Sequence, residues 1–203
     1  MKLIDLSVSL NEKTPIYPGD PKTEIKQGGI LAKDGYEDHY VCVGTHVGTH
    51  IDAPAHMVAG GKTLDQVPLE QFFGKGIYIQ VQKSFDLEAI KKIPIAKGNI
   101  VLFHTGMSDA YHESAYYEKY PPLSEEIAHY LMSKKIKMVG VDMCSVDYPP
   151  FPVHRILLGA GVLIIENLTN LSSLAGKEFV VHAFPVKLQL DGAPVRVVAE
   201  IQN

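Results

Sequence analysis

Residues 46–56 read HVGTHIDAPAH and contain four side chains of the kinds that commonly bind metal ions. They are His46, His50, Asp52 and His56, which stand at even steps along the chain. Side chains two, four and six residues apart point to one face of an extended chain, so all four can converge. A helix would also bring the first two together, but Gly48 and a proline in the segment disfavour it. We therefore predict an extended metal-binding segment.

The donor atoms of this segment indicate the kind of metal. Two histidine nitrogens and an aspartate oxygen suit zinc, and also manganese or iron, and leave positions free for water or substrate. Gly48 allows close backbone approach, Thr49 can hold a ligand by a hydrogen bond, and Pro54 stiffens the turn before the last histidine. An open site of this kind favours catalysis. A ferrous oxygenase and a metal-binding protein without turnover remain alternatives.

Two apolar segments each end on a carboxylate. Residues 137–141 lead to Asp142, and residues 162–165 lead to Glu166. Ligands tend to bind at the carboxyl ends of strands in α/β sheets, so both acids are candidate functional residues. Burying an acid there is costly unless it is paired or bound to a metal, and this makes Glu166 the stronger candidate. The alternative is that its strand simply emerges into water.

Composition limits the class of protein. The chain has 203 residues, which is enough for one domain with a sizeable core. Its 19 basic and 23 acidic side chains give a net charge of −4, so we expect a small-molecule substrate and neither nucleic acid nor a membrane as partner. The absence of a signal-peptide pattern or an apolar span predicts a cytoplasmic protein. Cys42 and Cys144 are expected to be reduced, packed thiols.

Strand-like and helix-like segments alternate along the chain without repeats or a linker. This predicts a single α/β domain over residues 1–203, with a mixed β-sheet core and short flanking helices. Asp86 is expected to cap a helix that ends near Lys92, and Ser124 to cap a second helix. The Asp-Gly pair at 191–192 predicts a hairpin near the C-terminus. The predicted strands span residues 3–10, 24–31, 37–45, 76–82, 99–104, 137–141, 161–166, 178–183 and 195–201.

The pattern HxGTHxDxPxH at residues 46–56 resembles the signature of the cyclase family of metal-dependent hydrolases, which includes bacterial kynurenine formamidase and isatin hydrolase. The resemblance extends over nearly the whole chain and keeps the order of the family's segments. Besides the signature, it rests on residues 4–7, 14–20, 140–142, 145–147, 154, 164–168 and 194–197.

The resemblance implies a set of site residues. His46, His50 and Asp52 match first-metal ligands, and His154 and Glu166 match positions that complete a second site, with Asp52 and Glu166 able to bridge. It implies one or two divalent ions, zinc or manganese. From its neighbours Pro152 and Arg155 alone, His154 would instead be an exposed loop histidine. The resemblance also implies a swivelling β/α fold and a homo-oligomer, a dimer or a tetramer.

His56 matches the family's catalytic histidine, which would carry protons while water attacks an amide or formamide carbonyl. N-formylkynurenine is the expected substrate, and a cyclic amide such as isatin is the alternative. Tyr17 stands where the formamidases commonly have tryptophan, and Tyr17, Phe103 and His104 are the predicted pocket residues. A core position is the alternative for Phe103. The tyrosine-rich residues 111–120 are interpreted as a lid, an oligomer contact or a surface loop.

Overall fold

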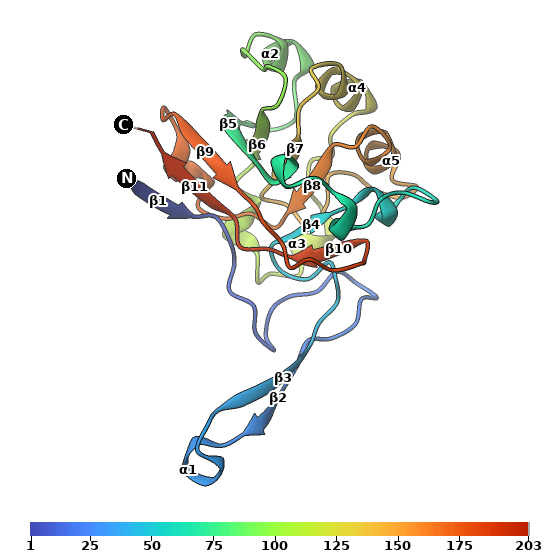
Figure 1. Cartoon of the computed structure of the whole chain (residues 1–203). Helices are drawn as coiled ribbons and strands as arrows, with labels where there is room; N and C mark the ends of the chain where they lie inside the picture. The colour runs from blue at the N-terminus through green and yellow to red at the C-terminus, as the bar shows by residue number, and fades with distance from the viewer. Residues whose placement is uncertain (203) are drawn as a thin grey trace.

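The centre of the molecule is a curled, mixed sheet of nine strands, which Figure 1 shows from one side. The computed structural model describes residues 1–202. The strand order is β1-β11-β9-β5-β6-β7-β8-β4-β10. In chain order these strands are β1 (Lys2–Asp5), β4 (His50–Asp52), β5 (Phe73–Gln80), β6 (Ile100–His104), β7 (Met138–Val141), β8 (Leu163–Glu166), β9 (Phe179–His182), β10 (Gly192–Pro194) and β11 (Val198–Ile201).

The helices are short and flank this sheet, as predicted. The α-helices are α1 (Leu31–Asp34), α2 (Leu87–Lys91), α3 (Ala115–Glu118), α4 (Glu125–Ser133) and α5 (Pro152–Gly159). The 3₁₀ turns are η1 (Pro54–His56), η2 (Leu64–Gln66), η3 (Leu69–Phe72), η4 (Met107–Ala110) and η5 (Leu171–Leu174).

The four strands β5 to β8 pair in parallel, and the remaining pairs of the large sheet are antiparallel. Strand β6 is buried on both faces, which parallel strands covered on both sides require. Val101 and Phe103 point into one hydrophobic cluster, and Ile100 and Leu102 point into the other. The sheet therefore separates two hydrophobic cores.

Both predicted helix caps are confirmed. The Asp86 carboxylate accepts hydrogen bonds from the first turn of α2, and the Ser124 hydroxyl accepts one from Ile127 at the start of α4. Helix α4 buries Ile127 and two neighbours of its apolar face, whereas Met132 is exposed. Helix α5 was not predicted. It begins at Pro152, a favoured residue in the first turn of a helix.

The observed strands fall inside or beside the predicted ones, but two local predictions are wrong. Residues 46–56 are extended only in β4, because Gly48 takes a positive φ of 61° and residues 54–56 form η1. The hairpin at 191–192 does not form. Instead β10 pairs with β4, a strand far away in sequence, with Gly192 opposite Asp52.

Strands β2 (Glu24–Gly29) and β3 (Asp38–Cys42) form a separate two-stranded sheet. With α1 at its tip, this β2–β3 arm projects away from the large sheet (Figure 1). All five residues of β3 are exposed. Cys42 is therefore a solvent-facing thiol and not the packed one expected, whereas Cys144 is buried.

None of the helices within residues 1–202 has the length and apolar character needed to span a bilayer.

Candidate metal centre

Strands β4 and β8 lie side by side and bring together residues that are far apart in sequence. Their antiparallel register places His50 directly opposite Glu166. Asp52, two residues further along β4, shares the face of His50, because alternate residues of a strand point the same way. All three side chains are almost fully buried. The sheet itself therefore assembles one half of the candidate centre.

Hydrogen bonds fix which nitrogens face the centre. The Nδ1 of His50 lies 2.8 Å from the carbonyl oxygen of Gly48, so its Nε2 points inward. That Nε2 is 3.5 Å from Oδ1 of Asp52 and 3.4 Å from Oε2 of Glu166. The Nδ1 of His46, from the loop before β4, lies 2.8 Å from the same Asp52 oxygen.

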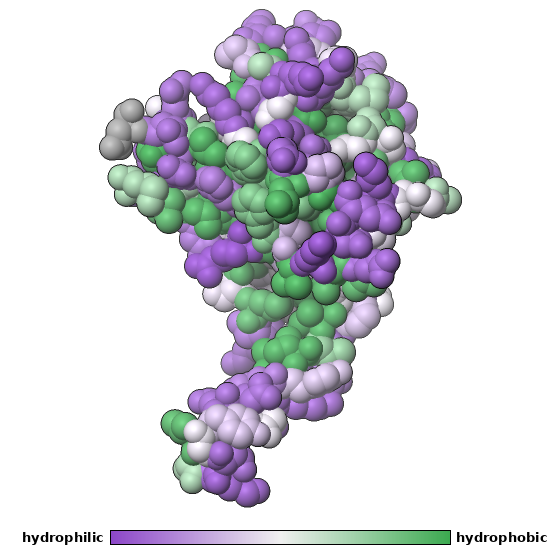
Figure 2. All heavy atoms as spheres, viewed as in Figure 1, coloured by the Kyte–Doolittle hydropathy of each residue, from purple (hydrophilic) through white to green (hydrophobic). Residues whose placement is uncertain are grey.

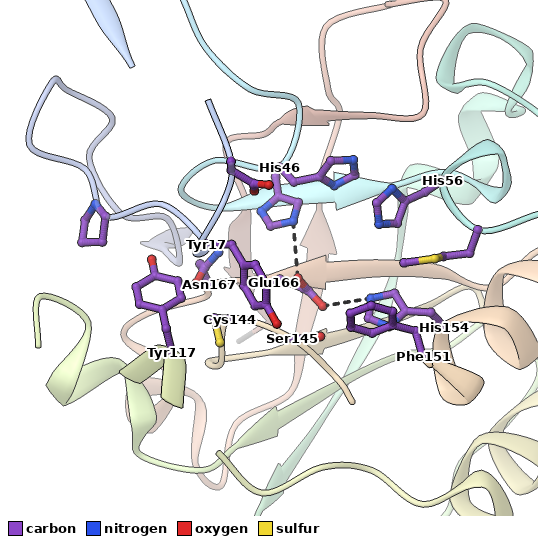
Figure 3. Close-up of a pocket in the computed structure, with 14 residues that line it drawn as sticks. Tyr17, His46, His56, Tyr117, Cys144, Ser145, Phe151, His154, Glu166 and Asn167 are labelled. Atoms are coloured by element: carbon purple, nitrogen blue, oxygen red, sulfur yellow. Dashed lines mark ion pairs between the residues drawn. The ribbon is translucent and has the colours of Figure 1, made fainter. Parts of the chain in front are cut away.

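Helix α5 supplies the other half. The Nε2 of His154 lies 3.3 Å from Oε1 of Glu166 and 3.8 Å from Oδ2 of Asp52. Figure 3 shows Glu166 between two histidine rings, with both ion pairs drawn as dashed lines. His154 is 2% exposed, so the alternative of a surface loop histidine is wrong. The sequence did not reveal α5, which carries this residue into the core.

The residues present fit a bound divalent cation. Within residues 1–202, Oδ2 of Asp52 is one of three buried side-chain polar atoms without a hydrogen-bond partner. Leaving a buried carboxylate oxygen unpaired is costly unless a cation compensates it. Donor atoms of His46, Asp52 and His56 lie within 4.8 Å of one another, as do those of His50, Asp52 and Glu166. Asp52 belongs to both groups, and imidazole and carboxylate donors suit zinc or manganese.

The charges of these groups are strongly coupled. Burial opposes the charged form of His46, but the Asp52 and Asp191 carboxylates outweigh it and raise its pKa to about 9. Burial likewise opposes the charge of His154, whose pKa is raised to about 10 by Asp147 and Glu166. Burial also disfavours the charged carboxylates of Asp52 and Glu166, yet the surrounding histidines lower both pKa values. The acids are therefore ionised and ready to bind a cation.

His56 lies beside these residues at the end of η1. Its ring centroid is 3.9 Å from that of His46 and 6.1 Å from that of His154. The Nδ1 of His56 is 3.2 Å from Oδ2 of Asp191, which also lies 2.8 Å from Nε2 of His46. Sequence reasoning missed Asp191 because it interpreted 191–192 as a turn. The following Gly192 was the available signal, since glycine also marks close backbone approach.

A cavity of about 230 Å³ opens onto this centre (Figure 3). Tyr17, a predicted pocket residue, lines it and makes an edge-to-face contact with Tyr117, with ring centroids 6.2 Å apart. Phe151 adds a third aromatic wall, and the buried Cys144 lies at its floor. The cavity therefore combines an apolar, aromatic side with the cluster of histidines and carboxylates.

The structure places the two other predicted pocket residues elsewhere. Phe103 is fully buried in the core against Phe85, as its alternative interpretation held. The ring of His104 hydrogen-bonds Tyr78 and Gln80, away from the residues that line the cavity. Both sit on β6, whose end does not reach the centre because β7 and β8 lie between it and β4.

Two other sequence candidates have structural roles. Asp142 is fully buried, and its carboxylate accepts hydrogen bonds from the backbone of Thr105 and Gly106 instead of facing the centre. The tyrosine-rich residues 111–120 form a surface segment whose residues 112–115 are exposed and whose Tyr111, Tyr116 and Tyr120 pack inward. Tyr116 is fully buried and donates its hydroxyl hydrogen to Asn167, so the segment supports the floor of the cavity, with Tyr117 in its wall.

Comparison with known proteins agrees with the resemblance in the sequence. A family profile described as putative cyclase matches residues 4–148. The chain belongs to this cyclase family. This cyclase-family protein is 31% identical to a kynurenine formamidase of Salinibacter ruber, over 98% of this chain and 97% of that protein.

Two solved structures share the fold of this cyclase-family chain. One is described as a potential metal-dependent hydrolase with cyclase activity, with a TM-score of 0.82 and 31% identity over 98% of this chain and 96% of that one. The other is an isatin hydrolase bound to the product analogue thioisatinate, with a TM-score of 0.85 and 25% identity over 98% and 91% of the two chains. The predicted fold class is confirmed.

Proposed function

We propose that this cyclase-family protein is a metal-dependent hydrolase that cleaves a carbon–nitrogen bond of an amide or formamide. The observation that carries the proposal is Oδ2 of Asp52, which has no hydrogen-bond partner and is buried among three histidines and Glu166 at the end of an aromatic cavity. A bound cation would compensate such an oxygen, and the cavity leaves room for a substrate beside it. The kynurenine formamidase and isatin hydrolase relatives both support hydrolysis as the reaction class.

The proposed ligands fall into two sets that share a carboxylate. His46, His50 and Asp52 would hold a first ion. His154 and Glu166, with Asp52 as a bridge, would hold a second. Zinc is the preferred ion because nitrogen and carboxylate donors of this number suit it, and manganese is the alternative.

A divalent ion bound there would supply Lewis-acid polarisation of the substrate carbonyl and activation of water. His56 would move the protons. Asp191 holds its Nδ1, which leaves Nε2 to accept a proton from the attacking water and to return it to the leaving amine. Water adds to the carbonyl carbon, the carbon–nitrogen bond breaks, and the amine leaves with the proton. Proton transfer of this kind typically contributes about 10²- to 10⁴-fold in rate.

We propose an aryl formamide of the N-formylkynurenine type as substrate. Tyr17, Tyr117 and Phe151 give the cavity aromatic walls against which an aryl ring can pack. Tyrosine at position 17 can stack on such a ring as tryptophan would. A cyclic aryl amide is the second candidate, favoured by the similarity to the isatin hydrolase structure.

The decisive experiment is a hydrolysis screen of the zinc-reconstituted protein with N-formylkynurenine, simpler aryl formamides, isatin and small cyclic amides. We expect release of formate from the aryl formamides that depends on zinc and is abolished by a chelator. Asp52→Asn serves as the inactive control. Ring opening of isatin without formamide cleavage would select the second candidate, and no turnover of any of them would contradict the proposed function.

We also propose that the protein is a homo-oligomer assembled through the β2–β3 arm with a second copy of the chain. A two-stranded ribbon outside a larger sheet is marginally stable in water by itself. Tyr36, Tyr40 and Val41 on this arm are all more than half exposed. The green patches that Figure 2 shows on the arm and where it joins the body belong to hydrophobic residues. A symmetric exchange of arms between copies would bury such residues on both, and homo-oligomers are the commonest oligomers.

A further inference from the structure

One carboxylate oxygen connects two histidines with different proposed roles. The Oδ2 of Asp191 lies 2.8 Å from Nε2 of His46 and 3.2 Å from Nδ1 of His56. The two rings pack 3.9 Å apart with an interplanar angle of 37°. His46 is a proposed metal ligand, whereas His56 is the proposed proton carrier. Asp191 therefore contacts both functions of the centre at once.

The backbone holds Asp191 in this place through the pairing of β10 with β4. The carbonyl oxygen of Asp191 accepts a hydrogen bond of 2.8 Å from the amide of Ala53, and Gly192 lies opposite Asp52 in the ladder. A Cβ added at Gly192 would lie 2.7 Å from Cε1 of His46, closer than side chains pack. Glycine at this position is thus what lets β10 pass beneath the His46 ring. The same ladder fixes Asp52 and Asp191 relative to each other.

These contacts determine which nitrogen of each ring donates a hydrogen bond to Asp191. A carboxylate only accepts hydrogen bonds, so His46 must donate from Nε2 and His56 from Nδ1. The Nδ1 of His46 faces a second carboxylate, because it lies 2.8 Å from Oδ1 of Asp52, so without a metal ion both nitrogens of His46 donate. A metal ion at Nδ1 would replace that hydrogen and leave the Nε2 hydrogen on Asp191. His56 is left with Nε2 as the nitrogen that can take up a proton. A carboxylate behind a metal-bound histidine is a recurring means of fixing its ring and tautomer.

We propose that Asp191 is a positioning residue, which sets the tautomers of His46 and His56 together so that one binds metal through Nδ1 and the other transfers protons through Nε2. The metal and proton-transfer roles in this inference rest on the proposed function. The geometric part, that one carboxylate selects both tautomers, does not depend on the substrate. Its prediction for His56 is specific, because an Nδ1–H imidazole is required there.

The test uses nitrogen-15 NMR of histidine-labelled, zinc-loaded protein, with no substrate present. We expect the wild-type protein to show His56 as the Nδ1–H tautomer and His46 bound through Nδ1. In Asp191→Ala neither ring finds an acceptor at this place, so we expect at least one of the two rings to change tautomer. We also expect the zinc affinity, measured by competition with a chromophoric chelator, to fall about 10- to 100-fold.

Glu200→Ala is the matched control, because Glu200 pairs with His182 at 3.2 Å on β11 and β9, outside the cavity lining. It should change neither the two tautomers nor zinc affinity. An Nε2–H tautomer of His56 in the wild-type protein would overturn the inference without any variant. So would an Asp191→Ala protein with unchanged tautomers and unchanged zinc affinity. The expected NMR and zinc results without hydrolysis of any amide would support the positioning role and contradict the proposed function.

Discussion

The Nδ1 of His154 lies 2.6 Å from Oδ1 of Asp147. The other carboxylate oxygen of Asp147 accepts a hydrogen bond of 2.6 Å from the amide of Val153, at the start of α5. One buried acid thus fixes both the helix that carries His154 and the orientation of its ring. The ring consequently presents Nε2 to Glu166.

Replacing Asp147 should weaken the metal centre without removing a ligand. In Asp147→Asn the side chain can still accept from α5, but it no longer offers the carboxylate that orients His154. We expect zinc affinity to fall about 10- to 100-fold, measured by chelator competition. Asp142→Asn is a matched control, since that equally buried carboxylate accepts hydrogen bonds from the backbone of Thr105 and Gly106 and lies outside the cavity lining. A loss of affinity in both variants alike would assign the effect to general destabilisation.

Replacing Asp52 tests whether it serves both sets of ligands. Asp52→Asn keeps the size of the side chain and removes the charge and one of the two acceptor oxygens. Asp52 belongs to both candidate ligand groups. We therefore expect both zinc ions to be lost, which elemental mass spectrometry would measure as the number of zinc ions per chain. Asp109→Asn, at an exposed position, should retain full content. Unchanged stoichiometry in Asp52→Asn would contradict the bridging role.

Replacing His56 should separate proton transfer from metal binding. His56→Ala removes the proposed proton carrier and keeps His46, His50 and His154, the proposed histidine ligands, so we expect zinc content near that of the wild-type protein. The value of kcat on the best aryl formamide should drop about 10²- to 10⁴-fold. The exposed His112→Ala provides a control for loss of an imidazole. Full activity in zinc-replete His56→Ala would remove His56 from the mechanism.

The metal-free protein should be most stable in mildly acidic solution. His46 and His154 have pKa values raised from 6.5 to about 9 and about 10, so their stabilising contribution is complete below pH 6.5 and is lost as the pH rises through those values. Asp52 and Glu166 have pKa values lowered from 3.8 and 4.5, so their contribution is complete above pH 4.5 and is lost on acidification. The Tm in chelator should therefore peak between pH 4.5 and 6.5.

A comparison of variants separates this effect from general alkaline unfolding. His154→Gln should lose less of its Tm between pH 6.5 and 10 than the wild-type protein loses. Equal slopes for the two proteins would mean that His154 does not contribute to the pH dependence.

The arm should determine the oligomeric state. Val41→Glu places a charge on an exposed strand of the β2–β3 arm, where a single copy would tolerate it. If a second copy covers the arm, burying that charge is costly, and we expect the molar mass from light scattering to fall to that of one chain. Leu69→Glu, at an exposed apolar position on the body, should leave the mass unchanged. A wild-type protein that is already monomeric at micromolar concentration would refute the proposal.

Local patterns in the sequence carried much of the fold. The caps at Asp86 and Ser124 act within their own helices. Segments rich in valine and isoleucine form the central strands, which are buried on both faces of the sheet. The metal-binding character of residues 46–56 was also a local signal, because the types of donor side chain and their close spacing in the sequence are enough to predict it. Pairing choices were not local. The Asp-Gly pair before β10 has the composition of a hairpin turn, yet β4 offers a partner that the sequence does not reveal.

The sequence alone determined the class of donor atoms, the family of the chain and the α/β fold class with its mixed sheet. Only the tertiary structure decided how the site is completed. It placed Glu166 opposite His50 and put Asp191 between His46 and His56. It also placed Phe103 in the core and His104 against Tyr78, both away from the cavity. The physical reason is that strand order and register, set by the burial of whole faces, decide which distant side chains meet.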